Sequence, residues 1–246
     1  MTALLGAAVA LVAGFVKGTI GFGFPTLATP LLALFIDVKT AVAVLVPPNL
    51  VLDGLQARRA GTGTGFGETI RRMAPLLLLG AVGTIVGTRL LVVLPPHVVT
   101  GTLGGFLVAF VVLNFSGVRL RVSIRWERWL SPPVGLVVGV IGGITNVPGT
   151  PLVIYFYALD LPKRDFVRWV AVSFIFYKLV QLAALVWYGA FPLGLLPAEI
   201  GMTLVALGSF FVGLKVQDRL EQQTFNRAVL GFLGLLGLWL TLRATT

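Results

Sequence analysis

Long apolar runs separated by short basic loops dominate this chain of 246 residues. Six of the runs are about 17–22 residues long, close to the roughly 20 residues that a helix needs to cross the hydrocarbon core of a bilayer. Only 11% of the residues are charged, whereas soluble domains carry about 25%. The pattern predicts an all-α polytopic membrane protein. The runs are approximately 2–36, 40–57, 73–94, 98–116, 132–159, 168–189, 196–214 and 226–242.

Two of these runs are longer than one crossing and are interrupted by glycine and proline. Run 2–36 contains Gly-Thr-Ile-Gly-Phe-Gly-Phe-Pro at 18–25, and run 132–159 contains Gly-Gly-Ile-Thr-Asn-Val-Pro-Gly at 142–149. Proline removes a backbone hydrogen-bond donor, and glycine in a helix carries an entropic cost. Both runs are therefore predicted to be discontinuous helices, as re-entrant hairpins or as pairs of short crossings.

The two interruptions share a sequence pattern. Gly-x-Ile-Gly at 18–21 is followed by Thr-Pro-Leu at 29–31, and the same two motifs recur at 139–142 and 150–152. All six matches have an offset of 121 residues, about half the chain. We therefore predict an internal repeat. Its parts are a first membrane repeat at 1–117, a cytoplasmic linker at 118–131 and a second membrane repeat at 132–246.

The basic residues predict how the repeats are oriented. Fourteen of the 19 lysines and arginines lie in or beside the loops 58–72, 118–130, 160–168 and 215–227. The connections 37–39, 93–97 and 189–194 together carry only Lys39. Since such a bias marks the cytoplasmic side, each interrupted run has to begin and end on one side of the membrane. The halves then have the same order and opposite orientation, an inverted repeat of the kind found in secondary transporters.

Ionisable side chains within the apolar runs mark a candidate site. Lys17 directly precedes the first break, and Lys178 lies near the centre of its run, where a charge costs roughly 3 kcal/mol or more. Arg89 lies near the end of its run, so we expect it to reach the interface. Other readings stay open: Lys17 also reaches the interface, or Asp53 pairs with Lys178. Near the end of its run, Asp53 could equally pair with the neighbouring Arg58 and Arg59 or take part in a proton relay.

The breaks and their surroundings predict an anion site. Helix N-termini beside a break present free N–H donors and partial positive charge, and glycine lets an anion approach the backbone. The alternative is that the glycines serve only close helix packing, and that the neutral polar residues are helix contacts or caps. The candidate substrate-binding residues are Lys17, Gly21, Phe22, Gly23, Asn49, Asn146, Thr150, Tyr177, Lys178 and Gln181.

Motifs of other functional classes are missing from the sequence. The chain has no cysteine, and its one histidine, His97, lies in a short loop beside prolines. No cluster of carboxylates points to a metal, and no glycine-rich loop ends in Gly-Lys-Ser/Thr. The net charge of +10 is explained by topology rather than by nucleic-acid binding. We expect neither an enzyme nor a cofactor.

The sequence resembles the TauE/SafE family of sulfite exporters and sulfonate permeases. The resemblance rests on Ala-Gly-Phe-Val-Lys-Gly-Thr-Ile-Gly-Phe-Gly-Phe-Pro-Thr-Leu-Ala-Thr-Pro at 13–30, the basic Ala-Arg-Arg-Ala-Gly at 57–61 and the second break at 139–152. It implies transport of sulfite, sulfonates or related anions across a bacterial inner membrane. The driving force would be the membrane potential or a coupling ion, a proton or sodium. The chain departs from the usual family pattern at Lys17, Phe22, Phe24 and Pro47-Pro48.

These observations favour a secondary transporter in the lipid bilayer, an exporter or a permease, for a small sulfur-containing oxyanion such as sulfite or an organosulfonate. One alternative is a channel for the same anions, which non-saturating flux without exchange would reveal. A second is a membrane-embedded enzyme acting on a lipid or phosphate ester, which would form a product in detergent. The missing histidine and carboxylate cluster counts against this enzyme.

Overall fold

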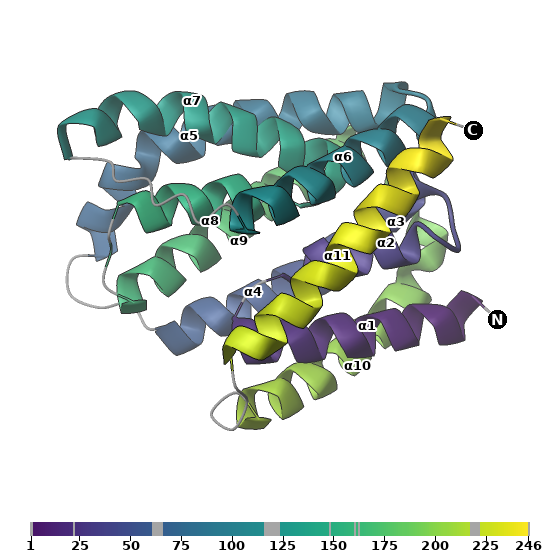
Figure 1. The fold of residues 1–246 in the computed structure, drawn as a ribbon. Coiled ribbons are helices and arrows are strands. Elements are labelled where there is room, and N and C mark those ends of the chain that lie inside the picture. The colour runs from purple at the N-terminus through teal and green to yellow at the C-terminus, as the bar shows by residue number, and fades with distance from the viewer. Residues whose placement is uncertain are drawn as a thin grey trace.

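The computed structural model describes residues 2–21, 23–60, 66–115, 124–147, 149–159, 161, 163–216 and 222–245. Within these ranges the chain is helical, with one 3-10 turn, η1, at Leu193–Leu195. Figure 1 shows the helices lying side by side in one bundle, with both ends of the chain on the same side. The α-helices are α1 (Thr2–Ile20), α2 (Phe24–Leu32), α3 (Val38–Val44), α4 (Val46–Ala60), α5 (Phe66–Val93), α6 (Pro96–Phe115), α7 (Ile124–Thr145), α8 (Gly149–Ala158), α9 (Lys163–Trp187), α10 (Leu196–Val216) and α11 (Gln222–Thr245).

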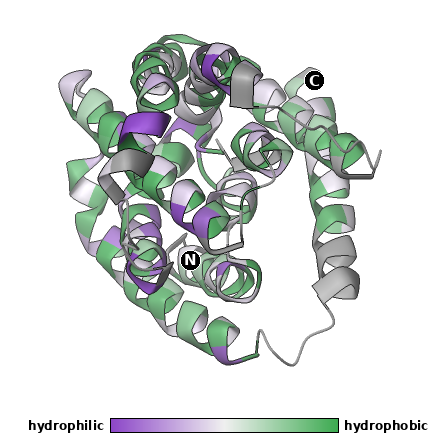
Figure 2. Cartoon of the chain, turned by 90° about the vertical axis from the view of Figure 1, so that its left-hand side faces the viewer, coloured by the Kyte–Doolittle hydropathy of each residue, from purple (hydrophilic) through white to green (hydrophobic). Residues whose placement is uncertain are grey.

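Six stretches of the described chain are long and apolar enough to cross a membrane. Large apolar side chains also face outward along the bundle: Leu78, Leu204 and Leu235 are 61%, 64% and 73% exposed. Seen from the left-hand side of Figure 1, most of the ribbon is hydrophobic (Figure 2). Such a surface suits lipid, and the chain is a polytopic helical membrane protein as predicted. The stretches are Val38–Arg59, Ile70–Val93, Pro96–Leu113, Trp126–Thr145, Asp165–Trp187 and Leu193–Val216.

Two helix boundaries differ from those expected. The run 40–57 forms two helices, α3 and α4, that meet at Leu45. Pro47 and Pro48 lie in the first turn of α4. Backbone N–H groups in a first turn have no acceptor within the helix, so proline is tolerated there. Helix α7 begins at Ile124, inside the segment predicted as a linker, and its first turns expose Trp126. Tryptophan is enriched where a helix leaves the membrane, so this turn fits the interfacial region.

Helices from the two halves of the chain pack closely against each other at glycines. Helix α1 packs along α10, and α7 packs along α5. A Cβ atom added to Gly14 of α1 would lie 2.6 Å from the carbonyl oxygen of Ala206. A Cβ atom added to Gly139 of α7 would collide with the carbonyl oxygen of Gly80 in α5. Small residues of this kind let membrane helices approach each other directly.

The two halves correspond at an offset that differs from the one in the motifs. Gly149 begins α8 and lies 125 residues after Phe24, which begins α2. The left-handed residues at the breaks, Gly21 (φ 91°) and Asn146 (φ 64°), are also 125 residues apart. The 121-residue offset of the matched motifs is therefore wrong as a structural alignment. Its Thr-Pro-Leu segments lie in the last turn of α2 and in the first turn of α8.

The helix pairing is consistent with this 125-residue correspondence. At this offset α1, α4, α5 and α6 of the first half correspond to α7, α9, α10 and α11 of the second. The packed pair α1–α10 then corresponds to the packed pair α7–α5, and α4–α9 and α6–α11 each pair two corresponding helices. In Figure 1, α1 runs from right to left and α7 from left to right. These features support an inverted repeat, which together with the division at 1–117 and 132–246 remains a proposal.

The glycine contacts predict an effect on stability. Gly139→Ala places a methyl group against the backbone of α5, so we expect a loss of about 1–3 kcal/mol from overpacking. Gly208→Ala in α10 is the matched control, because no atom lies within 4 Å of its added Cβ and alanine favours the helix by about 1 kcal/mol. Thermal unfolding in detergent measures both variants. Equal midpoints would contradict direct contact between α5 and α7.

Candidate functional site

Both interrupted runs are discontinuous helices, as predicted. The first break lies between α1 and α2, where Gly21 and Gly23 have φ of 91° and 97°. Residues that carry a side chain rarely adopt such positive φ angles, so glycine permits the chain to reverse here. The second break follows α7 at Asn146, whose φ of 64° is one that asparagine tolerates better than most residues. Each break interrupts the helix at a residue with a left-handed backbone.

Helices α4 and α9 each carry a buried polar face and pack against each other. On α4 the face is formed by Asn49, Asp53 and Gln56, which are spaced four and three residues apart and so project from one side of the helix. On α9, Lys178 and Gln181 are three residues apart and are each 1% exposed. Polar groups so fully removed from water and lipid need partners in the protein.

Lys17 of α1 and Asp53 of α4 form an ion pair in the interior. The Lys17 ammonium donates to Asp53 Oδ1, and the two side chains are 0% and 1% exposed. This pairing excludes three alternatives: Lys17 does not reach the interface, and Asp53 pairs neither with Lys178 nor with the arginines at the end of α4. Because the charges are opposite and adjacent, they largely cancel.

Lys178 has only neutral partners. Its ammonium donates to Asn146 Oδ1, to the Asn146 carbonyl oxygen at 3.2 Å and to Gln181 Oε1 at 2.7 Å. Gln181 in turn donates to the carbonyl oxygens of Gly142 and Gly143 at 3.3 and 3.2 Å. The last turn of α7 and the second break are thus tied to the middle of α9 through one lysine and one glutamine.

The first break is tied to α4 in a comparable way. Gln56 Nε2 donates to the carbonyl oxygen of Gly21. Gln56 and Gln181 are 125 residues apart, and so are Asp53 and Lys178. Each half therefore uses a glutamine on its α4 or α9 helix to hold its own break. Three positions before each glutamine lies an ionisable residue, the acidic Asp53 in the first half and the basic Lys178 in the second.

These residues form one buried polar cluster, which spans both halves. Asn146 Nδ2 donates to Thr29 Oγ1 at 3.2 Å, which joins the second break to helix α2 of the first half. The charges of Lys17 and Lys178 both act on Asp53. We use the name buried polar cluster for Lys17, Thr29, Asp53, Asn146, Lys178 and Gln181.

Several buried polar atoms on the facing helices α4 and α9 have no hydrogen bond within the part of the chain that the structure describes. They include both side-chain atoms of Asn49, Oδ2 of Asp53 and the hydroxyl of Ser173. Asn49 and Ser173 are each 0% exposed. Orphaned buried polar groups are rare in folded proteins, and they mark places where a further polar partner is accommodated.

The remaining candidates from the sequence lie elsewhere or outside the described residues. The Tyr177 hydroxyl donates to the Leu76 carbonyl oxygen of α5 at 3.0 Å, and the ring lies in an apolar cluster with Phe156 and Trp169. Phe22 and the side chain of Thr150 are outside the described residues. Arg89 is exposed near the end of α5, as expected, with its guanidinium 5.3 Å from the centre of the Tyr188 ring.

Sequence reasoning missed three polar residues at this site: Thr29, Gln56 and Ser173. Gln56 had a signal, because it continues the spacing of Asn49 and Asp53 along one face of α4. Thr29 and Ser173 had none, since their place depends on how distant helices pack. No group of three histidine, cysteine, aspartate or glutamate side chains close enough to hold a metal occurs in the described ranges.

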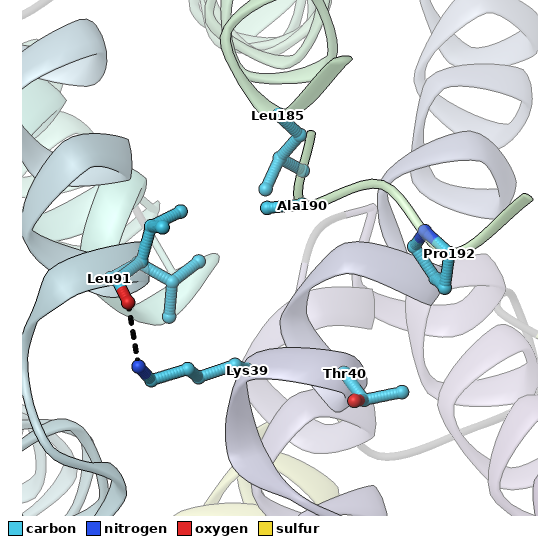
Figure 3. A pocket seen from close by; sticks show the side chains of 7 residues that line it. Lys39, Thr40, Leu91, Leu185, Ala190 and Pro192 are labelled. Atoms are coloured by element: carbon cyan, nitrogen blue, oxygen red, sulfur yellow. Dashed lines mark hydrogen bonds between the residues drawn. The ribbon is translucent and has the colours of Figure 1, made fainter. Parts of the chain in front are cut away.

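A separate pocket of about 210 Å³ opens near the ends of α5 and α9 (Figure 3). Its single cation, Lys39 of α3, donates to the carbonyl oxygen of Val92 at 2.7 Å. Leu91, Leu185 and Pro192 make most of the rest of the wall apolar. The pocket contains no residue of the buried polar cluster, so it is a distinct feature of the fold.

Comparison with protein families decides the identity of this arrangement. The family model described as sulfite exporter TauE/SafE matches residues 6–240, which include both breaks and the whole buried polar cluster. The chain belongs to the TauE/SafE family. Searches of curated proteins and of solved structures gave no match. The TauE/SafE assignment makes this multi-pass membrane protein a member of a transporter family, and it leaves the substrate to be argued from the site.

Proposed function

We propose that this TauE/SafE protein is a secondary transporter of a small sulfur-containing oxyanion, such as sulfite or an organosulfonate. The observation that carries the proposal is Lys178, a lysine that is 1% exposed and has only neutral oxygens around it. A buried cation without an acidic partner costs free energy, and in transporters it marks a substrate path. An anion is the partner that would balance this charge.

The hydrogen bonds around Lys178 suggest how an anion binds. All three ammonium protons point to oxygens of Asn146 and Gln181. A sulfonate or sulfite oxygen replaces one of these neutral acceptors by a charged one, which forms a shorter and stronger hydrogen bond. Asn49 supplies a further unused donor on the buried polar face of the facing helix α4. Binding would therefore compete with the bond between Lys178 and the second break.

The same competition offers a route to alternating access. Asn146 joins Lys178 to Thr29, so an anion that displaces Asn146 loosens the contact between the second break and helix α2 of the first half. In transporters built from inverted repeats, the substrate site lies between broken helices and one repeat moves against the other. We place the protein in a bacterial inner membrane, with a proton or sodium as the candidate coupling ion.

Uptake into proteoliposomes tests the proposal. We expect saturable uptake of labelled sulfite or a sulfonate, accelerated when unlabelled anion is loaded inside. Flux that rises linearly with concentration and shows no exchange would instead identify a channel. Absence of flux for every sulfur oxyanion would overturn the proposal, and formation of a product in detergent would favour an enzyme.

Asn146 provides a matched pair of variants for the Lys178 site. Asn146→Asp places a carboxylate against the Lys178 ammonium and cancels its charge, so we expect anion uptake to fall by about tenfold or more. Asn146→Gly also tolerates the positive φ but introduces no charge, and we expect it to retain uptake. If both variants lose uptake equally, the geometry of the break rather than the charge of Lys178 matters.

A further inference from the structure

The buried charges set a limit on the charge of the substrate. Lys17 and Asp53 form an ion pair, whereas Lys178 has neutral partners. Two positive charges and one negative charge leave the buried polar cluster with one uncompensated positive charge. Within the part of the chain that the structure describes, Lys178 has no carboxylate partner, and the ion pair of the cluster is the one between Lys17 and Asp53.

Other acidic groups of the described chain belong to different parts of the fold. Glu127 pairs with Arg72 near the start of α5, and Asp165 pairs with Arg168 within α9. Glu199 lies in the first turn of α10, and no charge in the described chain acts on it. None of these carboxylates offsets the charge of Lys178. The single positive charge is therefore a property of the cluster itself.

A single buried positive charge favours a singly charged anion. The cost of removing an ion from water rises with the square of its charge, so a dianion loses about four times as much hydration energy as a monoanion of the same size. Its attraction to the same cation only doubles, because Coulomb energy is proportional to charge. A dianion would also leave the occupied site with a net negative charge in a low-dielectric interior.

We propose that the site selects monoanions, such as a sulfonate or hydrogensulfite, over dianions such as sulfate. Asp53 determines this charge selectivity by neutralising Lys17. The inference rests on the proposed function and goes beyond it, because it names the charge of the substrate and the residue that fixes it. Replacing Asp53 by a neutral residue would give the cluster two positive charges and favour dianions.

Methanesulfonate and sulfate are suitable probes, because both present tetrahedral sulfur and they differ in charge. We expect methanesulfonate to inhibit uptake and to raise the unfolding temperature of the purified protein at concentrations about tenfold or more below those needed for sulfate. Equal or stronger binding of sulfate overturns the charge inference but leaves anion transport standing. Failure of both probes in both assays overturns the proposed function as well.

Three variants separate charge from structure. Asp53→Asn should shift the methanesulfonate-to-sulfate affinity ratio toward sulfate by about tenfold. The double variant Lys17→Met with Asp53→Asn again has one positive charge, so its ratio should return to that of the wild type. Arg89→Gln removes an exposed cation outside the cluster and should leave the ratio unchanged. A folded Asp53→Asn protein with the wild-type ratio, or a folded double variant that prefers sulfate, overturns the role of Asp53.

Discussion

Lys178→Met is expected to abolish anion uptake while the protein still folds and reaches the membrane. The variant removes a buried cation that has no acidic partner among the described residues. Loss of a charge-assisted contact worth about 3 kcal/mol lowers affinity about a hundredfold. The change leaves oxygens of Asn146 and Gln181 without their donor, but it also removes the cost of burying an ammonium group. These opposing effects should leave the unfolding temperature close to that of the wild type.

Proteoliposome uptake and detergent unfolding together measure this prediction. Lys39→Met is the matched control, because it also replaces a lysine by methionine but in the pocket near the ends of α5 and α9. We expect the control to retain uptake. Normal uptake by Lys178→Met would remove this residue from the substrate site. Loss of uptake together with a large drop in unfolding temperature would assign Lys178 a structural role instead.

The arrangement of helices could be predicted from sequence because it depends on local physical requirements. A run of apolar residues has to satisfy its backbone within a helix, and glycine and proline at 18–25 and 142–149 interrupt that helix. Both breaks and the long apolar helices follow from these two rules. The offset between the halves does not, because two short glycine-rich motifs can match by composition alone at 121 residues.

The partners of the charged residues could not be predicted. Lys17 and Asp53 are 36 positions apart, and their contact depends on how α1 packs against α4. The sequence suggested Lys178, or Arg58 and Arg59, as partners for Asp53, and the structure shows Lys17 instead. The buried lysines were recognisable because a charge inside an apolar run is expensive wherever it lies. Which lysine is neutralised, and hence which is available to an anion, required the structure.

The ion pair between Lys17 and Asp53 predicts the largest effect on stability. Lys17→Met leaves the Asp53 carboxylate buried without its cation, because Asp53 Oδ2 already lacks a partner among the described atoms. Removing one member of a buried pair destabilises a protein by about 3–5 kcal/mol. We therefore expect Lys17→Met to unfold at a clearly lower temperature than the wild type, and to fold less well than Lys178→Met.

A double-mutant cycle separates the interaction energy between Lys17 and Asp53 from the effect of each substitution on its own. Asp53→Asn alone leaves Lys17 as an unpaired buried cation, so it should also destabilise the protein. The double variant Lys17→Met with Asp53→Asn contains neither charge and should be more stable than either single variant, since replacing a buried pair by neutral groups is often nearly neutral. If the two single variants lower the free energy of unfolding by amounts that simply add in the double variant, the two charges do not interact in the folded protein. The net charge of the buried polar cluster, on which the proposed selection of monoanions rests, would then be wrong.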